Sequence, residues 1–186
     1  ERGLIVLYLG IIGLFSGFFY TAPPFRLVNR GIGELVIGLN FGVLMVLGSY
    51  YVQVQTIALE PIIASIPVSL LITAVLYINE FPDFEADRAV GKRTLVVRLG
   101  RERAVVGYVA FIVATYLSII LAIVTGHMPP YTLLALLTVP KALQAISVAR
   151  EHYADSPDLV PACANTVQIH LMTGLLITAG YFLNAL

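Results

Sequence analysis

The sequence predicts an all-α, polytopic transmembrane helix bundle, folded as a single domain over residues 1–186. Hydrophobic residues make up 59% of the chain and charged residues only 12%, whereas a soluble globular domain has roughly 25% charged residues. Six apolar segments also have the length of about 20 residues that spans a hydrocarbon core. Because a backbone exposed to lipid must satisfy its own hydrogen bonds, each segment is predicted to be a helix.

The predicted spans follow one another along the whole chain. They lie at residues 3–20, 34–54, 61–79, 103–126, 131–150 and 165–185. The second span contains Gly38 and Gly42, and glycines four residues apart allow two helices to approach closely. Lys141 lies inside the fifth span beside Pro140. It indicates either a polar cavity next to a helix kink or a side chain that reaches toward an interface.

The links between the spans alternate in character. Those near 56–61 and 126–130 are short and nearly uncharged, whereas those at 21–33, 80–102 and 151–164 are longer and polar. With six spans, the three longer links fall on one side of the membrane. The basic residues on that side are Arg26, Arg30, Arg88, Lys92, Arg93, Arg98, Arg101 and Arg103. Because basic residues favour the cytoplasmic side, these links are predicted to be cytoplasmic and the C-terminus to lie outside.

Other polar residues do not indicate a second site. Asp155 and Asp158 stand between prolines, and the stretch from Tyr153 to Pro161 is interpreted as a turn rather than as a second metal site. His127 and His152 fall in links on opposite sides of the predicted membrane, so they cannot share a site.

One stretch, from Asn79 to Gly100, concentrates the charge of this apolar chain. Asn79, Asp83 and Asp87 are spaced four residues apart, and residues at i and i+4 lie on one face of a helix. The spacing therefore predicts a helical end that points an amide and two carboxylates in one direction. Such carboxylates suit Mg²⁺, which is usually held by one or two of them together with water and substrate phosphates.

Basic residues follow the acids directly. Gly91 precedes Lys92 and Arg93, and such cations bind phosphate oxygens, arginine through paired hydrogen bonds and lysine as a point charge. Acids, glycine and bases in this order predict a metal–diphosphate site at a membrane surface. The alternative is a solvated loop whose basic residues only set topology, and it is favoured for the later arginines Arg98, Arg101 and Arg103. It does not explain the aspartates, because topology does not require regularly spaced acids.

The charged stretch resembles the motif of a known family. Its pattern Asn-x3-Asp-x3-Asp-x3-Gly-Lys-Arg-Thr, followed by Val-Arg-Leu-Gly, is similar to the second aspartate-rich motif of the UbiA superfamily of intramembrane prenyltransferases. The segment Gly-Lys-Arg-Thr-Leu is most similar to the branch that prenylates 1,4-dihydroxy-2-naphthoate in menaquinone biosynthesis. The earlier stretches 20–26 and 30–35 resemble the link after the fourth helix of the family. The resemblance extends over the whole chain in order.

The resemblance also bears on how much of such a protein is present. Family members have nine helices and two aspartate-rich motifs, each in a cytoplasmic link. This chain has six predicted spans and one such motif, and it begins with Glu1 rather than Met. It therefore resembles helices four to nine, and we expect a fragment or a processed chain that is inactive by itself. The expected partner is a set of N-terminal helices that carries the first aspartate-rich motif.

The resemblance implies a reaction and roles for residues. The reaction is the magnesium-dependent transfer of a prenyl group from a polyprenyl diphosphate to an aromatic or other lipid-precursor acceptor, in quinone or lipid biosynthesis. The enzyme would be a multi-pass protein of the cell membrane, surrounded by lipid, with its active site facing the cytoplasm; nucleic acid is not an expected partner. The implied catalytic metal ligands are Asp83 and Asp87, with Asn79 as a neighbouring ligand. The implied diphosphate-binding residues are Arg26, Arg88 and Lys92, and Tyr20 would line the path of the allyl cation.

Two other functions fit parts of the pattern. A CDP-alcohol phosphotransferase also has about six spans and an aspartate-rich site, but its fuller Asp-x2-Asp-Gly-x2-Ala-Arg signature is absent from this sequence. A membrane transporter or channel subunit would use Asp83 and Asp87 as an ion site. These acids lie at the end of a predicted span, whereas transport sites usually lie near mid-membrane.

Overall fold

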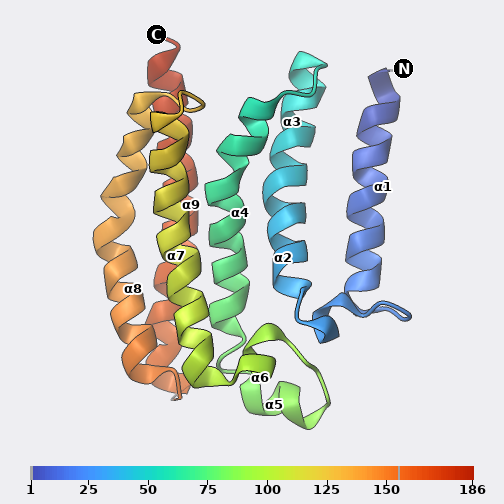
Figure 1. The fold of residues 1–186 in the computed structure, drawn as a ribbon, viewed down its shortest axis with the longest axis vertical. Helices are drawn as coiled ribbons and strands as arrows, with labels where there is room; N and C mark the ends of the chain where they lie inside the picture. Colours follow the sequence, from blue (N-terminus) through green and yellow to red (C-terminus); the bar gives the residue numbers. More distant parts are fainter. Residues whose placement is uncertain (1, 155) are drawn as a thin grey trace.

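The computed structural model of the chain describes residues 2–154 and 156–186 and consists of helices, with no strand in these ranges. Six helical spans among the described residues are long and apolar enough to cross a membrane. They lie side by side, with both termini at one end of the bundle and the short helices α5 and α6 at the other (Figure 1). The prediction of an all-α polytopic bundle is confirmed.

Four of the spans are single α-helices, and the other two change helical type along their length. The elements are α1 (Arg2–Thr21), η1 (Leu27–Arg30), α2 (Gly33–Gly38), η2 (Leu39–Leu44), α3 (Met45–Val54), α4 (Leu59–Asn79), α5 (Phe84–Ala89), α6 (Leu95–Leu99), α7 (Arg101–Val124), η3 (Pro130–Thr138), α8 (Val139–His152) and α9 (Ser156–Asn184). The second span consists of α2, η2 and α3, and the fifth consists of η3 and α8.

The second span packs closely against α4 through two of its glycines. A Cβ atom on Gly38 would collide with Thr73, and one on Gly42 would collide with Ser69. Gly42 lies in η2, a π-helical segment, and such segments are often found at functional sites. The close approach predicted from the glycine spacing is therefore present, and it holds α2 and η2 beside the helix that leads into the charged link.

The final helix begins earlier than the sequence predicts. The interpretation of residues 153–161 as a turn is wrong from residue 156 onward, because α9 starts there. Pro157 is compatible with the first turn of a helix, where backbone N–H groups have no intrahelical acceptor. Asp158 also lies in that turn, where a negative charge is favourable. Asp155 lies outside the described residues.

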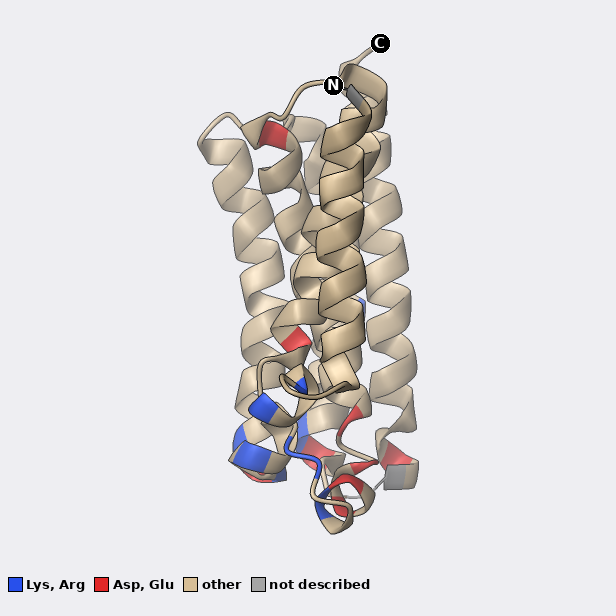
Figure 2. Ribbon diagram, turned by 90° about the vertical axis from the view of Figure 1, so that its right-hand side faces the viewer, with Lys and Arg blue, Asp and Glu red and all other residues tan. Residues whose placement is uncertain are grey.

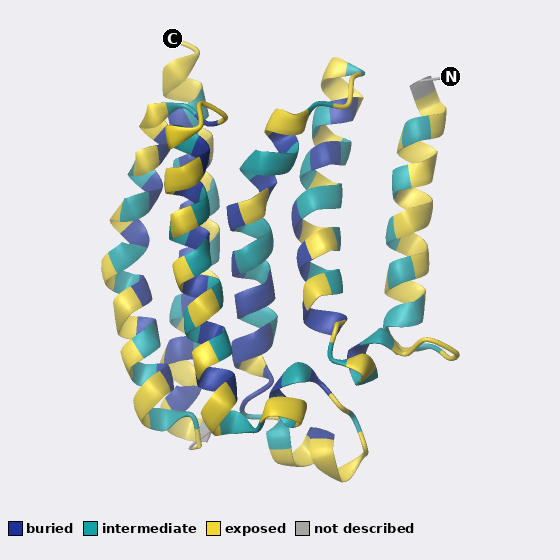
Figure 3. Cartoon of the chain, viewed as in Figure 1, coloured by how far each residue is buried: buried dark blue, intermediate teal, exposed yellow. Residues whose placement is uncertain are grey.

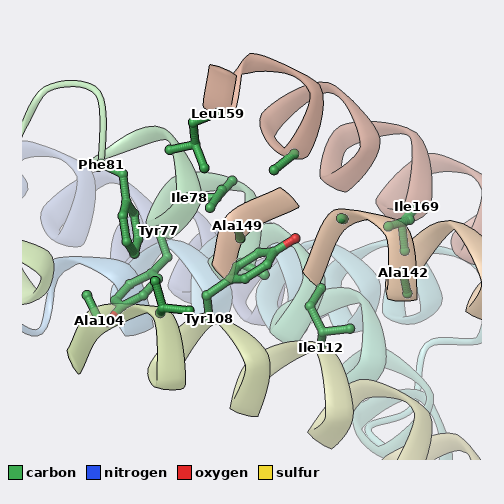
Figure 4. Packing of buried hydrophobic residues seen from close by; sticks show 14 of the residues in the cluster. Tyr77, Ile78, Phe81, Ala104, Tyr108, Ile112, Ala142, Ala149, Leu159 and Ile169 are labelled. Atoms are coloured by element: carbon green, nitrogen blue, oxygen red, sulfur yellow. The ribbon is translucent and has the colours of Figure 1, made fainter. Parts of the chain in front are cut away.

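The core of the molecule lies between α4, α7, α8 and α9. Large side chains such as Tyr77, Phe81 and Tyr108 are buried there, as Figure 4 shows. The Tyr108 hydroxyl donates to Thr166 Oγ1 at 2.7 Å, and Thr166 Oγ1 in turn donates to the Ala162 carbonyl. Lys141 of α8 donates to the Gln168 side chain of α9 at 2.6 Å, so this intramembrane lysine connects the two helices.

The opposite side of the bundle is packed less tightly. Figure 3 shows that buried residues are concentrated in and around α4, whereas α1 is largely exposed or half-buried. Most of the charged residues gather at the end of the bundle where α5 and α6 lie (Figure 2). The fold therefore presents one charged end on a set of apolar helices, and the candidate site is at that end.

Candidate functional site

The charged link between α4 and α7 folds into two short helices. α4 ends at Asn79, and a turn over residues 80–83 separates it from α5. Pro82 lies in this turn and has no backbone N–H with which to continue the helical hydrogen bonds. Asn79 and Asp83 are thus on opposite sides of a helix break. Asp83 and Asp87 are one helical turn apart, with the Asp87 amide donating to the Asp83 carbonyl at 2.8 Å.

The two aspartates have different surroundings. Asp83 is exposed at the start of α5. Asp87 is buried, and its Oδ2 accepts a hydrogen bond from Lys92 Nζ at 2.8 Å. The backbone amide of Lys92 also donates to the Asp87 carbonyl at 2.9 Å. This ion pair joins the acidic part of the link to its basic part.

Asn79 points elsewhere. Its Nδ2 donates to the Val75 carbonyl of its own helix at 2.7 Å, and it lines a cavity of about 280 Å³ together with Ile37 and Phe41. In the part of the chain that the structure describes, no three His, Cys, Asp or Glu side chains gather closely enough to hold a metal. Two carboxylates one turn apart still fit Mg²⁺, because this ion usually keeps several waters and takes further oxygens from substrate phosphates.

A cavity lined mainly by cations lies next to the aspartates. Its volume is about 610 Å³, and the lining residues are Arg88, Gly91, Lys92, Arg93, Val97 and Arg98. Gly91 has a φ of 73°, a left-handed conformation that glycine adopts without steric cost. The turn at Gly91 lets the chain reverse after α5. The cavity has the charge and the hydrogen-bond donors to bind phosphate oxygens.

The two site residues predicted from the N-terminal part lie on neighbouring elements. Arg26 is exposed on the link between α1 and α2 and has a left-handed φ of 44°. It is not among the residues that line the cationic cavity. Tyr20, near the end of α1, is half-buried and lines an apolar cavity of about 410 Å³ with Asn40. Arg88 and Lys92 thus line the same cavity and Arg26 does not, whereas the Tyr20 ring lies against Gly33, the residue before the buried Glu34.

Two buried glutamates beside the site are absent from the predicted set. Glu34 in α2 is 1% exposed, and Glu80, directly after α4, is 4% exposed. Among the described residues, the Oε2 atom of each is buried without a hydrogen-bond partner. Burial and the negative charge of Glu34 raise the pKa of Glu80 to about 9, so the folded environment favours the neutral form of this carboxyl group. The sequence signal was available, since Glu34 is an acid at the edge of an apolar span.

Comparison with known proteins identifies relatives along most of the chain. A family model described as "UbiA prenyltransferase family" matches residues 2–160. A 2-carboxy-1,4-naphthoquinone phytyltransferase from Synechocystis sp. is 33% identical over 177 residues, which are 95% of this chain and 57% of that protein. A 1,4-dihydroxy-2-naphthoate octaprenyltransferase from Bacillus subtilis is 28% identical over 176 residues, 95% of this chain and 56% of that protein.

A human protein is also similar to this chain. The human UbiA prenyltransferase domain-containing protein 1 is 31% identical over 181 residues, which are 97% of this chain and 50% of that protein. The chain thus spans about half the length of these curated relatives. No solved structure gives a significant match.

Proposed function

The chain belongs to the UbiA prenyltransferase family, and from this premise we propose that it takes part in the Mg²⁺-dependent transfer of a prenyl group from a polyprenyl diphosphate to an aromatic acceptor. Its six apolar spans make it an integral membrane protein. Two relatives are named for naphthoate or naphthoquinone substrates, which supports a quinone precursor as the acceptor. The observation that carries the proposal is the acidic turn of α5, joined by the Asp87–Lys92 ion pair to the cationic cavity.

Each group of the site has an assigned role. Asp83 and Asp87 would hold Mg²⁺, which would supply positive charge next to the diphosphate. Arg88 and Lys92 donate hydrogen bonds to the diphosphate oxygens, and Arg26 contributes from the neighbouring link. Because Asp87 and Lys92 are paired with each other, metal and diphosphate are expected to bind together, each taking one member of the pair.

The proposed reaction breaks one bond of the allylic diphosphate and forms one bond to the acceptor. The C–O bond to the diphosphate breaks, the electron pair leaves with the diphosphate, and an allyl cation remains. A carbon of the electron-rich acceptor forms the new C–C bond, and the proton that it carried passes to the released diphosphate. Tyr20 is assigned to shelter the cation, since the face of an aromatic ring attracts positive charge.

The proposal extends to orientation and to the rest of the site. We place the charged links in the cytoplasm, because basic residues favour that side of the membrane. The matched segments cover 50 to 57% of the relatives. We therefore assign the other half of the metal site to N-terminal helices that carry the first aspartate-rich motif.

Calorimetry with an unreactive thio-analogue of an allylic diphosphate tests this function in the full-length protein. Tight binding is expected only when Mg²⁺ is present. Lys92→Ala or Arg26→Ala should weaken it by roughly 10- to 150-fold, because a hydrogen bond to a charged group contributes about 1.5–3 kcal/mol. Arg150→Ala, which removes an exposed charge at the end of α8, is the matched control and should bind as the parent does.

The same titration separates the rival function. An ion site of a transporter would bind its cation without diphosphate, and removal of Lys92 would leave that binding unchanged or improve it. Binding of the analogue that does not depend on Mg²⁺, or no binding at all, would count against prenyl transfer.

A further inference from the structure

Two hydrogen bonds connect the charged link to α2 and to the segment just before it. Glu34 Oε1 accepts from the backbone amide of Leu95 at 2.7 Å, between residues 61 positions apart. Arg98 Nη2 donates to the Asn29 carbonyl at 2.8 Å, between residues 69 positions apart. Leu95 and Arg98 are the first and fourth residues of α6. The two bonds therefore hold both ends of one short helix.

Glu34 completes the cap of α6 from another helix. The first amides of a helix have no intrahelical acceptor and need another partner. Within α6, Thr94 Oγ1 accepts from the Val97 amide at 3.3 Å, and Glu34 Oε1 takes the Leu95 amide. The Glu34 side chain is 1% exposed, and its backbone carbonyl accepts from Thr73 of α4 at 3.3 Å. Burying a carboxylate costs free energy unless hydrogen bonds replace the water that it loses. The Leu95 amide supplies such a bond to Glu34 Oε1.

Arg98 forms the second connection. Its Nε donates to the Arg93 carbonyl at 3.0 Å, while its Nη2 reaches Asn29. A Cβ atom on Gly31 would lie 2.7 Å from Arg98 Cδ, so the aliphatic part of Arg98 packs directly on that glycine. Gly31 also has a left-handed φ of 71°. The planar guanidinium presents several donors at once, which a lysine ammonium on a flexible stem does not reproduce.

We propose that Glu34 is a positioning residue for the cationic cavity, and that it acts by holding α6 against α2, with Arg98 as its second anchor. The loop over residues 91–93 lies between two fixed points. The Asp87–Lys92 ion pair holds its α5 side, and the Glu34–Leu95 bond holds its α6 side. Without the Glu34–Leu95 hydrogen bond, Lys92 and Arg93 no longer keep their positions in the cavity. The consequence for diphosphate binding rests on the proposed function; the connection itself does not.

Amide hydrogen exchange on the full-length protein in detergent tests the connection without an activity assay. Glu34→Ala removes the acceptor of the Leu95 amide, and Glu34→Gln keeps a side-chain oxygen of the same reach. We expect a peptide covering residues 94–99 to exchange about tenfold faster or more in Glu34→Ala. The same peptide should exchange in Glu34→Gln as in the parent. Glu60→Ala serves as the matched control. It removes an acid from the first turn of α4, at the end of that helix far from Asn79 and the charged link.

A second substitution keeps the test valid if Glu34→Ala does not fold. Arg98→Lys retains the charge but cannot serve Asn29 and Arg93 together, so it should also accelerate exchange of the 94–99 peptide. Unchanged exchange in both variants would overturn the proposal. Equal acceleration in Glu34→Gln and Glu34→Ala would overturn it as well, because the oxygen acceptor would then not matter.

Steady-state kinetics tests the consequence for the site. In an active enzyme, Glu34→Ala should raise the KM for the polyprenyl diphosphate by about tenfold, and Glu34→Gln should restore the parent value. An unchanged KM in Glu34→Ala would refute the positioning role. If the exchange pattern is as expected but the parent transfers no prenyl group, the connection stands and the proposed function fails.

Discussion

At the residue scale, Asp83, which stands at the N-cap position of α5, and Asp87, which lies within it, have different surroundings. Asp83 is exposed and available to a cation from solvent, whereas Asp87 is buried and already paired with Lys92. In the proposed metal site, removing Asp83 takes away one ligand. Removing Asp87 takes away a ligand and also the partner of Lys92, whose ion pair with Asp87 closes the turn after α5.

Substituting either aspartate should abolish Mg²⁺-dependent prenyl transfer in the complete enzyme. The physical reason is that a ligand of the shared cation stabilises the transition state more than the ground state. Asp83→Asn tests the charge by itself. Glu85→Ala, an exposed acid of the same helix, should remain close to the parent. Activity within about threefold of the parent for both aspartate-to-alanine variants, measured at saturating Mg²⁺, would exclude this role.

Glu80 makes stability depend on pH. Its pKa rises from 4.5 to about 9 in the folded chain, so between these values the folded state binds more protons than the unfolded state. The contribution of Glu80 to the free energy of unfolding is then fully present at low pH, and it is lost as the pH rises toward about 9. Glu80→Gln cannot ionise, and its thermal midpoint should fall less over that range than the midpoint of the parent.

Circular dichroism melting in detergent across the pH range measures this difference. Glu102→Gln, an exposed glutamate at the start of α7, is the control and should follow the parent. Parallel pH profiles for Glu80→Gln and the parent would show that Glu80 ionises equally easily in both states.

At the element scale, the contact between the second span and α4 positions the start of the charged link. η2 places Gly42 against Ser69, and α2 places Gly38 against Thr73. Both contacts lie on the helix that ends at Asn79. The same span carries Glu34, so one pair of helices supports α6 and the turn before α5.

Gly42→Ala should destabilise the bundle, because the added methyl group would collide with Ser69. Overpacking of this kind costs about 1–3 kcal/mol, which corresponds to a thermal midpoint lower by roughly 2–12 °C in a chain of this size. Gly48→Ala is the matched control, since the space around that position is open. Equal midpoints for Gly42→Ala and the control would show that this contact is not close in solution.

At the scale of the whole molecule, the distribution of charge predicts the orientation in the membrane. The cationic cavity and most of the charged residues lie at the end opposite to the termini (Figure 2). Because basic residues are retained on the cytoplasmic side, that end should face the cytoplasm. In the proposed function, the diphosphate group would bind at this charged end and the prenyl chain would lie among the apolar helices.

Single cysteines test the orientation after Cys163 is replaced by alanine. A cysteine at Ala89 should react with an impermeant maleimide only from the cytoplasm, and one at His127 only from outside. His127 is chosen because it is exposed, while the adjacent Gly126 has a left-handed φ of 76° that a cysteine would strain. The reverse labelling pattern would place the site on the outer side.

The sequence by itself determined the six spans and the place of the charged link, because hydrophobic length and charge are local properties of the chain. It also predicted that Asp83 and Asp87 lie one turn apart, since a single hydrogen-bonded turn sets that relation. The early start of α9 was missed because Pro157 indicates a break in most contexts but is compatible with a first helical turn. The sequence also did not decide whether Pro82 ends the helix between Asn79 and Asp83, because proline is compatible with either a helix end or a kink within a helix.

Only the tertiary structure decided what surrounds these residues. The bonds from Glu34 to Leu95 and from Arg98 to Asn29 join positions that are 61 and 69 residues apart, and no spacing rule covers such distances. The burial of Glu34 and Glu80 likewise results from the packing of α2 against α4. Burying a polar side chain costs free energy unless the fold supplies a hydrogen-bond partner where water is excluded. That partner is known only after distant segments of the chain have been brought together.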